Sequence, residues 1–202
     1  NTGGMGAYAP TPVVPDALLQ RVQSEVLEPA IATLRARGID YRGVLYAGLM
    51  ITPDGDLKVI EFNCRFGDPE TQVVLPLLDT PLESLLMACA KKTLADHPPI
   101  QWKEGAAACV ILASGGYPAS YQKGFAITGI DAAEANGAMV FHAGTRITNN
   151  QLVTDGGRVL GVTALGDTFK EAIAHAYQAV DHIEFEGMYC RRDIGFRVLG
   201  NA

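Results

Sequence analysis

Hydrophobic residues recur at intervals of three and four over residues 16–37, and this spacing predicts an amphipathic helix. Gly38 follows as a stop signal, and Pro29 is expected to kink the helix because it has no backbone N–H. The tetrapeptide TPLE at 80–83 has the form of a capping box with proline at the first helical position. It predicts another helix, which we expect to end near Leu94.

Two runs rich in β-branched and aromatic residues, 42–52 and 57–63, flank the turn sequence PDGD. They predict an antiparallel hairpin. After a loop at 65–69 the chain is expected to become helical. Residues 1–15 are rich in glycine and proline and show no period, so we expect a loop there.

The pattern changes beyond the polar, proline-bearing segment 96–104, where short strands replace the helices. We therefore expect two domains, at 1–98 and 99–202, and an α+β protein whose sheet is mostly antiparallel. A final helix at 167–183 is predicted, with Asp167 as its N-cap. The strands predicted in this half are 106–113, 125–130, 139–142, 151–154 and 158–164.

Charge narrows the choice of partners, because 16 Lys and Arg against 22 Asp and Glu give a net charge of −6. Without a basic run longer than two residues, a nucleic-acid groove is disfavoured. No apolar stretch approaches the roughly 20 residues that cross a bilayer, and the start has no signal-peptide pattern. We expect a cytoplasmic protein that binds neither nucleic acid nor a membrane.

Cysteine and glycine usage add two observations. Cys64, Cys89, Cys109 and Cys190 are far apart and form no C-x-x-C, which disfavours a zinc site and a disulfide framework. We expect them to be buried, reduced thiols. Glycine is in excess, with 22 of 202 residues and no collagen-like period.

Glu61 and Asn63 are the first candidate for chemistry. Side chains two apart on a strand point to the same face, so a carboxylate and an amide carbonyl project together. Mg²⁺ prefers such oxygen ligands and commonly takes only one or two from the protein. If the strand continues, Arg65 joins this face and adds a cation suited to phosphate or carboxylate. A solvated strand face is the alternative.

The segment RFGDPETQ at 65–72 places one cation and two anions in a loop between a strand and a helix. Pro69 favours extended geometry at Asp68, and Glu70 is expected near a helix N-terminus. A local ion pair between Arg65 and Asp68 is the alternative explanation for the loop.

The opening segment, NTGGMGAY, has three glycines in four positions, which lets backbone N–H groups approach an anion. It fits G-x-G-x-x-A, but no strand precedes it and Pro10 and Pro12 block the following helix, so the dinucleotide motif fails. A plain flexible loop is the alternative.

Taken together, three segments resemble the glycinamide ribonucleotide synthetase (phosphoribosylamine–glycine ligase) family of ATP-grasp enzymes: NTGGMGAY, GVLYAGLM and VIEFNCRFGDPETQ. The second half adds SGGYP at 114–118, DGGRVLGVTA at 155–164 and YCRRDIGFR at 189–197. The resemblance covers essentially the whole chain. It implies the second half of an ATP-grasp domain at 1–98 and the small C-terminal α+β domain at 99–202.

The resemblance implies ATP-dependent ligation of glycine to 5-phosphoribosylamine. ATP phosphorylates the glycine carboxylate, and the amine then displaces phosphate from the acyl phosphate. No nucleophile of the enzyme is needed, and the chain offers no convincing Ser/His/Asp or Cys/His set. Phosphoryl transfer mainly asks for positioning and charge neutralisation.

Roles for individual residues also come from the resemblance. Glu61 and Asn63 would bind Mg²⁺ or Mn²⁺ at the ATP phosphates, and Arg65 would steady the phosphoryl group or the glycine carboxylate. Asp68 and Glu70 would orient the substrate or Arg65. The backbone N–H groups of Thr2, Gly3, Gly4 and Gly6 would line the same cavity. Gly115, Gly116 and Arg158 could close over the substrate, although tight turns explain all three almost as well.

Two departures from the family pattern are visible. Many ATP-grasp enzymes carry another metal carboxylate on the strand before E-x-N, but residues 44–52 contain no acid. The Rossmann-like N-terminal domain and the first grasp subdomain are absent, so we expect the C-terminal portion of a monomeric ligase, inactive alone. The alternatives are another ATP-grasp carboxylate–amine ligase and a non-catalytic Mg²⁺- or anion-binding module.

Overall fold

The computed structural model describes residues 3–200 and divides the chain into two compact units. The sheet unit combines residues 1–10, 68–79 and 102–202, and the hairpin unit combines residues 11–67 and 80–101. The units are therefore interleaved along the chain and cross the boundary predicted at 98/99. The cause is that residues 6–9, early in the sequence, pair with residues 107–110, at its middle.

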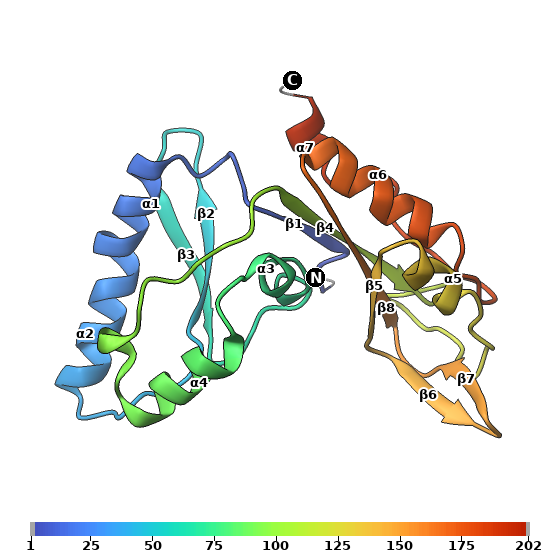
Figure 1. Ribbon diagram of the computed structural model, residues 1–202, viewed down its shortest axis with the longest axis horizontal. Coiled ribbons are helices and arrows are strands. Elements are labelled where there is room, and N and C mark those ends of the chain that lie inside the picture. The colour runs from blue at the N-terminus through green and yellow to red at the C-terminus, as the bar shows by residue number, and fades with distance from the viewer. Residues whose placement is uncertain (1–2, 201–202) are drawn as a thin grey trace. The chain divides into compact units, whose positions relative to one another are not determined.

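A four-stranded antiparallel sheet forms the centre of the sheet unit, in the order β1-β4-β8-β5 (Figure 1). Strand β1 lies inside the segment predicted to be a loop, so that prediction is wrong. Its sequence, GAYA, has weak strand propensity of its own, and pairing with β4 supplies the stabilisation. The strands are β1 (Gly6–Ala9), β4 (Ala106–Ala113), β8 (Arg158–Gly166) and β5 (Met139–His142).

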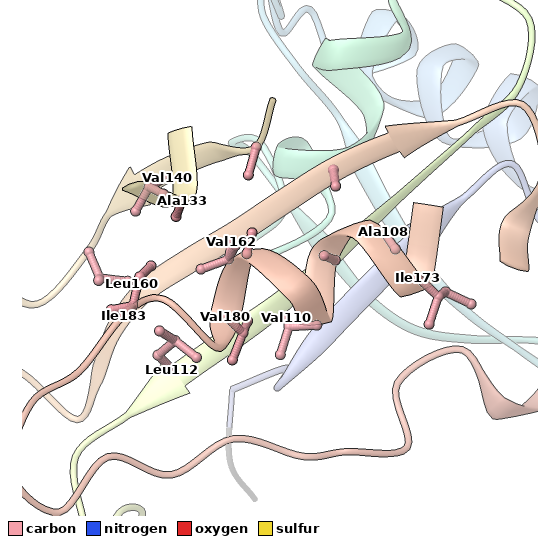
Figure 2. Close-up of a cluster of buried hydrophobic side chains, with 14 of the residues drawn as sticks. Ala108, Val110, Leu112, Ala133, Val140, Leu160, Val162, Ile173, Val180 and Ile183 are labelled. Carbon is pink, nitrogen blue, oxygen red and sulfur yellow. The ribbon is translucent and has the colours of Figure 1, made fainter. Parts of the chain in front are cut away.

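All eight residues of β4 are buried because helices cover both of its faces. Alternate side chains, among them Val110 and Leu112, join the core beneath α6 (Phe169–Val180), as Figure 2 shows. The intervening residues, including Cys109, pack with Val73 and Leu77 of α3 (Thr71–Leu77). This strand was predicted with its observed limits.

The remaining elements of the sheet unit correct one prediction. Residues 125–130 form single bridges at Ala126 and Thr128, and α5 (Ile130–Ala135) begins where the strand was expected to end. Strand β6 (Thr145–Thr148), which was not predicted, pairs with β7 (Gln151–Thr154), which was. A short helix, α7 (Phe196–Leu199), lies near the end of the chain.

The N-cap of α6 is Thr168, so the prediction of Asp167 is wrong by one residue. Thr168 Oγ1 accepts from the Glu171 backbone N–H at 3.2 Å, and Glu171 Oε2 accepts from the Thr168 N–H at 3.1 Å. This capping box satisfies two backbone donors that a helix start leaves open. An aspartate at 167 cannot complete the same reciprocal pair.

Residues 16–36 of the hairpin unit are helical, as predicted, and a π-helical turn interrupts the α-helix just before Pro29. Helix α1 (Asp16–Val22) passes through a π-helical turn, η1 (Gln23–Leu27), into α2 (Glu28–Ala36). Proline at the start of α2 cannot donate to the preceding turn, which explains the local change in hydrogen bonding.

The predicted hairpin is confirmed as β2 (Tyr46–Ile51) and β3 (Leu57–Asn63), with a register shift between Gly48 and Leu49. Arg21 Nη1, in α1, donates a hydrogen bond to Gly55 O in the hairpin turn at 2.9 Å, which links the turn to the helix. The hairpin is a two-stranded sheet, and neither strand contains a buried residue.

Helix α4 (Leu82–Lys91) begins one residue later than predicted, because Pro81 is its N-cap and not its first residue, and the predicted capping box does not form. A 3₁₀ turn, η2 (Leu94–Asp96), follows the helix. Thr80 Oγ1 instead accepts from the Gln101 backbone N–H at 2.7 Å, so it is not available to the helix. Lys92, with φ of 63°, ends the helix in the left-handed conformation, before the predicted Leu94. Within residues 3–200, none of the helices is long and apolar enough to cross a membrane.

Candidate active site

Glu61 and Asn63 lie side by side on β3, as their spacing predicts. Asn63 Nδ2 donates to Glu61 Oε1 at 2.9 Å, which leaves the amide oxygen and the second carboxylate oxygen for other partners. Gly48 of β2 is opposite Glu61, and a Cβ there would lie 3.1 Å from Glu61 Cγ. Gly48 therefore makes room for the Glu61 side chain.

The chemistry of this pair fits a hard cation. One carboxylate oxygen and one amide oxygen can bind Mg²⁺, with phosphate oxygens and water completing its shell. No group of three or more His, Cys, Asp or Glu side chains that could hold a metal occurs among residues 3–200. A metal at Glu61 and Asn63 would therefore take most of its ligands from a substrate and from water.

Arg65 does not extend the face of β3, because the strand ends at Asn63. Its Nη1 donates to Phe66 O at 2.8 Å, and its side chain is exposed. The neighbouring Cys64 is also exposed, which contradicts the expectation that all cysteines are buried. Cys109 of β4 is the buried one, and burial raises the pKa of its thiol to about 11.

Asp68 and Glu70 begin the next segment, at the start of α3 in the sheet unit. Glu70 is the N-cap residue of α3, as its expected place near a helix start implied. Pro69 between them is fully buried, whereas Asp68 is exposed. Gln72 Nε2 donates to Asp68 Oδ1 at 3.2 Å, which holds one carboxylate oxygen against the first turn of the helix.

Arg158, the first residue of β8, is the cation that pairs with Asp68. Its Nη2 donates to Asp68 Oδ2 at 2.7 Å. Its Nη1 donates to two carbonyl oxygens, Gly4 O at 3.0 Å and Asp68 O at 3.2 Å. The guanidinium thus joins three segments of the sheet unit: the glycine segment, the start of α3 and the central strand β8.

The glycines of the opening segment have different surroundings. The Gly3 N–H donates to Tyr117 Oη at 3.2 Å, Gly4 offers its carbonyl to Arg158, and Gly6 lies in β1 opposite Val110. Thr2, which was grouped with them, lies outside the described residues. Because the Gly3 N–H already donates to Tyr117 Oη, its binding of an anion remains a prediction.

Tight packing explains Gly115 and Gly116 of the SGGYP loop. A Cβ at Gly115 would lie 2.8 Å from Gly187 O. Gly116 has φ of 97°, and a Cβ there would clash with Ser120 O. Backbone conformation and close approach thus account for both glycines. The structure brings Arg158, but neither glycine, into contact with Asp68.

Sequence reasoning missed Tyr117 as a contact of the glycine segment. A Cβ at Gly157 would meet the Tyr117 ring, so Gly157 leaves space for that ring next to Arg158. The available signal was the position of Tyr117 directly after two glycines, with Gly157 directly before Arg158. Neither motif shows by itself that the two meet.

Comparisons with known proteins match both halves of the chain to models of one family. Residues 1–71 match the family model for the phosphoribosylglycinamide synthetase ATP-grasp (A) domain, and residues 107–197 match the model for the phosphoribosylglycinamide synthetase C domain. The phosphoribosylamine–glycine ligases of Nostoc sp. and Synechocystis sp. are 64% and 58% identical over 199 residues, or 98% of this chain. These residues are 47% and 48% of the relatives, so the chain spans about half their length.

Solved structures show the same likeness. A phosphoribosylamine–glycine ligase from Thermotoga maritima has a TM-score of 0.85 at 35% identity and covers 96% of this chain, which covers 47% of that one. Biotin carboxylase from Campylobacter jejuni has a TM-score of 0.60 at 14% identity, covering 98% of this chain and 42% of its own, and shows the fold alone. The α+β ATP-grasp fold class is confirmed.

Proposed function

Because the chain belongs to the phosphoribosylglycinamide synthetase family, we propose that it is the C-terminal half of a ligase that joins glycine to 5-phosphoribosylamine. ATP phosphorylates the carboxylate of glycine, and the amine of phosphoribosylamine attacks the acyl phosphate and releases phosphate. The products are glycinamide ribonucleotide, ADP and phosphate. The match of both family models in their order along the chain carries this proposal.

Glu61 and Asn63 are the residues that would hold Mg²⁺ or Mn²⁺. When bound there, the cation would neutralise phosphate charge, a contribution of several kcal/mol in metal-assisted reactions. Their adjacent position on β3, with the Gly48 gap beside Glu61, supports this assignment. Arg65, two residues beyond the end of β3, would bind the transferring phosphoryl group or the glycine carboxylate.

Asp68 and Glu70 would orient the substrate. Both oxygens of the Asp68 carboxylate are held by neighbours, one by Gln72 and one by Arg158. A carboxylate fixed in this way can accept a further hydrogen bond from an ammonium group without first reorganising. Glycine carries such a group, and phosphoribosylamine carries the amine that attacks.

The test uses the longer natural protein that contains this chain, assayed for glycinamide ribonucleotide formation with ATP, glycine and phosphoribosylamine. We expect Glu61→Ala to lower kcat by about 100-fold or more, because the lost cation site contributes several kcal/mol. The thermal midpoint should change little, since Glu61 is exposed. Glu83→Ala, at an exposed position in the first turn of α4, is the matched control and should retain activity.

Two results would contradict the proposal. A wild-type protein that forms no glycinamide ribonucleotide is not this ligase, and a Glu61→Ala variant that loses stability in step with activity has lost a structural residue. The 202-residue chain alone should show no turnover, because it spans about half of the relatives' length. Turnover at the rate of the longer protein would disprove that expectation.

A further inference from the structure

Arg158 contacts two segments that are remote from it in the sequence. Asp68 is 90 positions away and Gly4 is 154 positions away, yet both receive hydrogen bonds from one guanidinium. We propose that Arg158 is a positioning residue that sets the geometry of Asp68 and the Gly3–Gly4 segment for binding an amino-acid substrate. The inference rests on the proposed function, in which that substrate is glycine.

The guanidinium is placed rigidly. Arg158 begins β8, and β8 pairs with the buried strand β4 and lies against α6 in the core of the sheet unit. Its side chain is only 20% exposed, against 45% for Asp68, so the cation is the more enclosed partner. A planar guanidinium offers its donors in a fixed fork and transmits this placement to the groups that it binds.

The glycine segment is shaped around the guanidinium. A Cβ at Gly3 would lie 2.9 Å from Arg158 Cζ and Nε, and a Cβ at Gly4 would lie 2.8 Å from Pro69 Cδ. A side chain at Gly3 would displace the Arg158 guanidinium or the segment, and one at Gly4 would push the segment away from the start of α3. Two consecutive glycines therefore permit the close approach that Arg158 requires.

The Asp68 carboxylate is fixed at both oxygens, by Gln72 at Oδ1 and by Arg158 at Oδ2. It remains partly exposed, so its unused lone pairs face solvent and can accept from a bound ammonium group. Without Arg158 the carboxylate could turn about its side-chain torsions. Misplacement of a binding group by about 1 Å can cost about 100-fold in rate.

Other arginine–aspartate pairs of the sheet unit provide a contrast. Arg192 Nη1 lies 2.8 Å from Asp181 Oδ1, but these side chains are 58% and 61% exposed, so both partners of this pair are open to solvent. Exposed pairs of this kind contribute about 0–1 kcal/mol to stability. Arg192→Gln is therefore a matched control for the loss of one arginine–aspartate pair.

The experiment is a double-mutant cycle in the longer natural protein, with Arg158→Gln, Asp68→Asn and the combined variant. We expect each single variant to lower kcat/KM for glycine by about 100-fold, mainly through KM for glycine. The combined variant should be no worse than the more impaired single variant, because Arg158 acts through Asp68. KM for ATP should change less than about twofold in every variant. Arg192→Gln should behave as the wild type.

Arg158→Lys separates positioning from simple charge. Lysine keeps the positive charge but cannot form the fork of donors that binds Asp68 Oδ2 and two carbonyls, so it should not restore KM for glycine. Thermal midpoints of all variants are measured in parallel. Restoration by lysine, additive losses in the cycle, or an activity loss that follows the thermal midpoint with KM for glycine unchanged would each overturn the inference. A wild type without ligase activity would overturn the proposed function instead.

Discussion

The sheet unit and the hairpin unit bury their hydrophobic residues to very different extents. Every residue of β4 is buried, whereas β3 contains no buried residue. Of the buried hydrophobic residues described, only Val26 and Ala88 belong to the hairpin unit, which has most of the large exposed ones, including Ile60 and Phe62. The difference shows that local pattern suffices to form a hairpin and helices, but not a closed core.

The candidate residues of the two units differ in the same way. Glu61 and Asn63 stand on β3 of the hairpin unit, where one hydrogen bond joins their side chains. Asp68 belongs to the sheet unit, where Arg158 and Gln72 hold it against a packed core. The Asp68 carboxylate is therefore held in place before any ligand binds, whereas the Glu61–Asn63 pair presents ligand atoms with little support.

The largest expected effect tests the difference in burial directly. Leu112→Ala, in the core of the sheet unit with 0% exposure, should lower the free energy of unfolding by about 2–5 kcal/mol. Ile60→Ala, in β3 with 63% exposure, should lower it by at most about 0.5 kcal/mol. Urea unfolding of the chain, followed by circular dichroism, gives both values. Equal losses would show that the hairpin unit has a core of its own.

A smaller effect tests how the main helix of the sheet unit, α6, begins. Thr168→Ala removes the Oγ1 acceptor of the capping box and should cost about 1 kcal/mol. Asp167→Ala should cost at most about 0.5 kcal/mol, because Asp167 does not cap the helix in the structure. The same unfolding measurement applies. A larger loss at Asp167 than at Thr168 would restore the cap predicted from the sequence.

Local sequence patterns predicted the elements whose information is local. Strand β4 and the hairpin follow from runs of β-forming residues, and α1 to α2 follow from a helical period. Strand β1 was missed because GAYA carries no alternation of polar and apolar residues, and only its pairing with β4 makes it a strand. Thr80 was predicted to cap α4, because the sequence cannot show that its hydroxyl oxygen accepts from the Gln101 backbone N–H instead.

The candidate site shows the same limit. The two-residue spacing of Glu61 and Asn63 was enough to place them side by side, because strand geometry converts spacing into proximity. The partner of Asp68 could not be found in this way, since Arg158 is 90 positions distant. Nor could spacing show that Tyr117 holds Gly3, which is 114 positions from it. Long-range contacts depend on the packed sheet.

The smallest expected effect concerns the charges of the open hairpin unit. Hydrogen bonds from Arg42 and Lys92 lower the pKa of Asp40 from 3.8 to about 2. Because the folded pKa lies below the unfolded one, the ionised carboxylate stabilises the fold above about pH 4, and this contribution is lost as the pH falls towards 2.

Asp40→Asn should therefore be less stable than the wild type near pH 6, and this difference should shrink on acidification. Thermal midpoints of both chains between pH 6 and pH 2.5 measure it, with Asp54→Asn, in the hairpin turn, as control. Since the Asp40 side chain is 53% exposed, salt should screen its ion pairs and reduce the difference as well. A difference that grows on acidification would reverse the assigned sign.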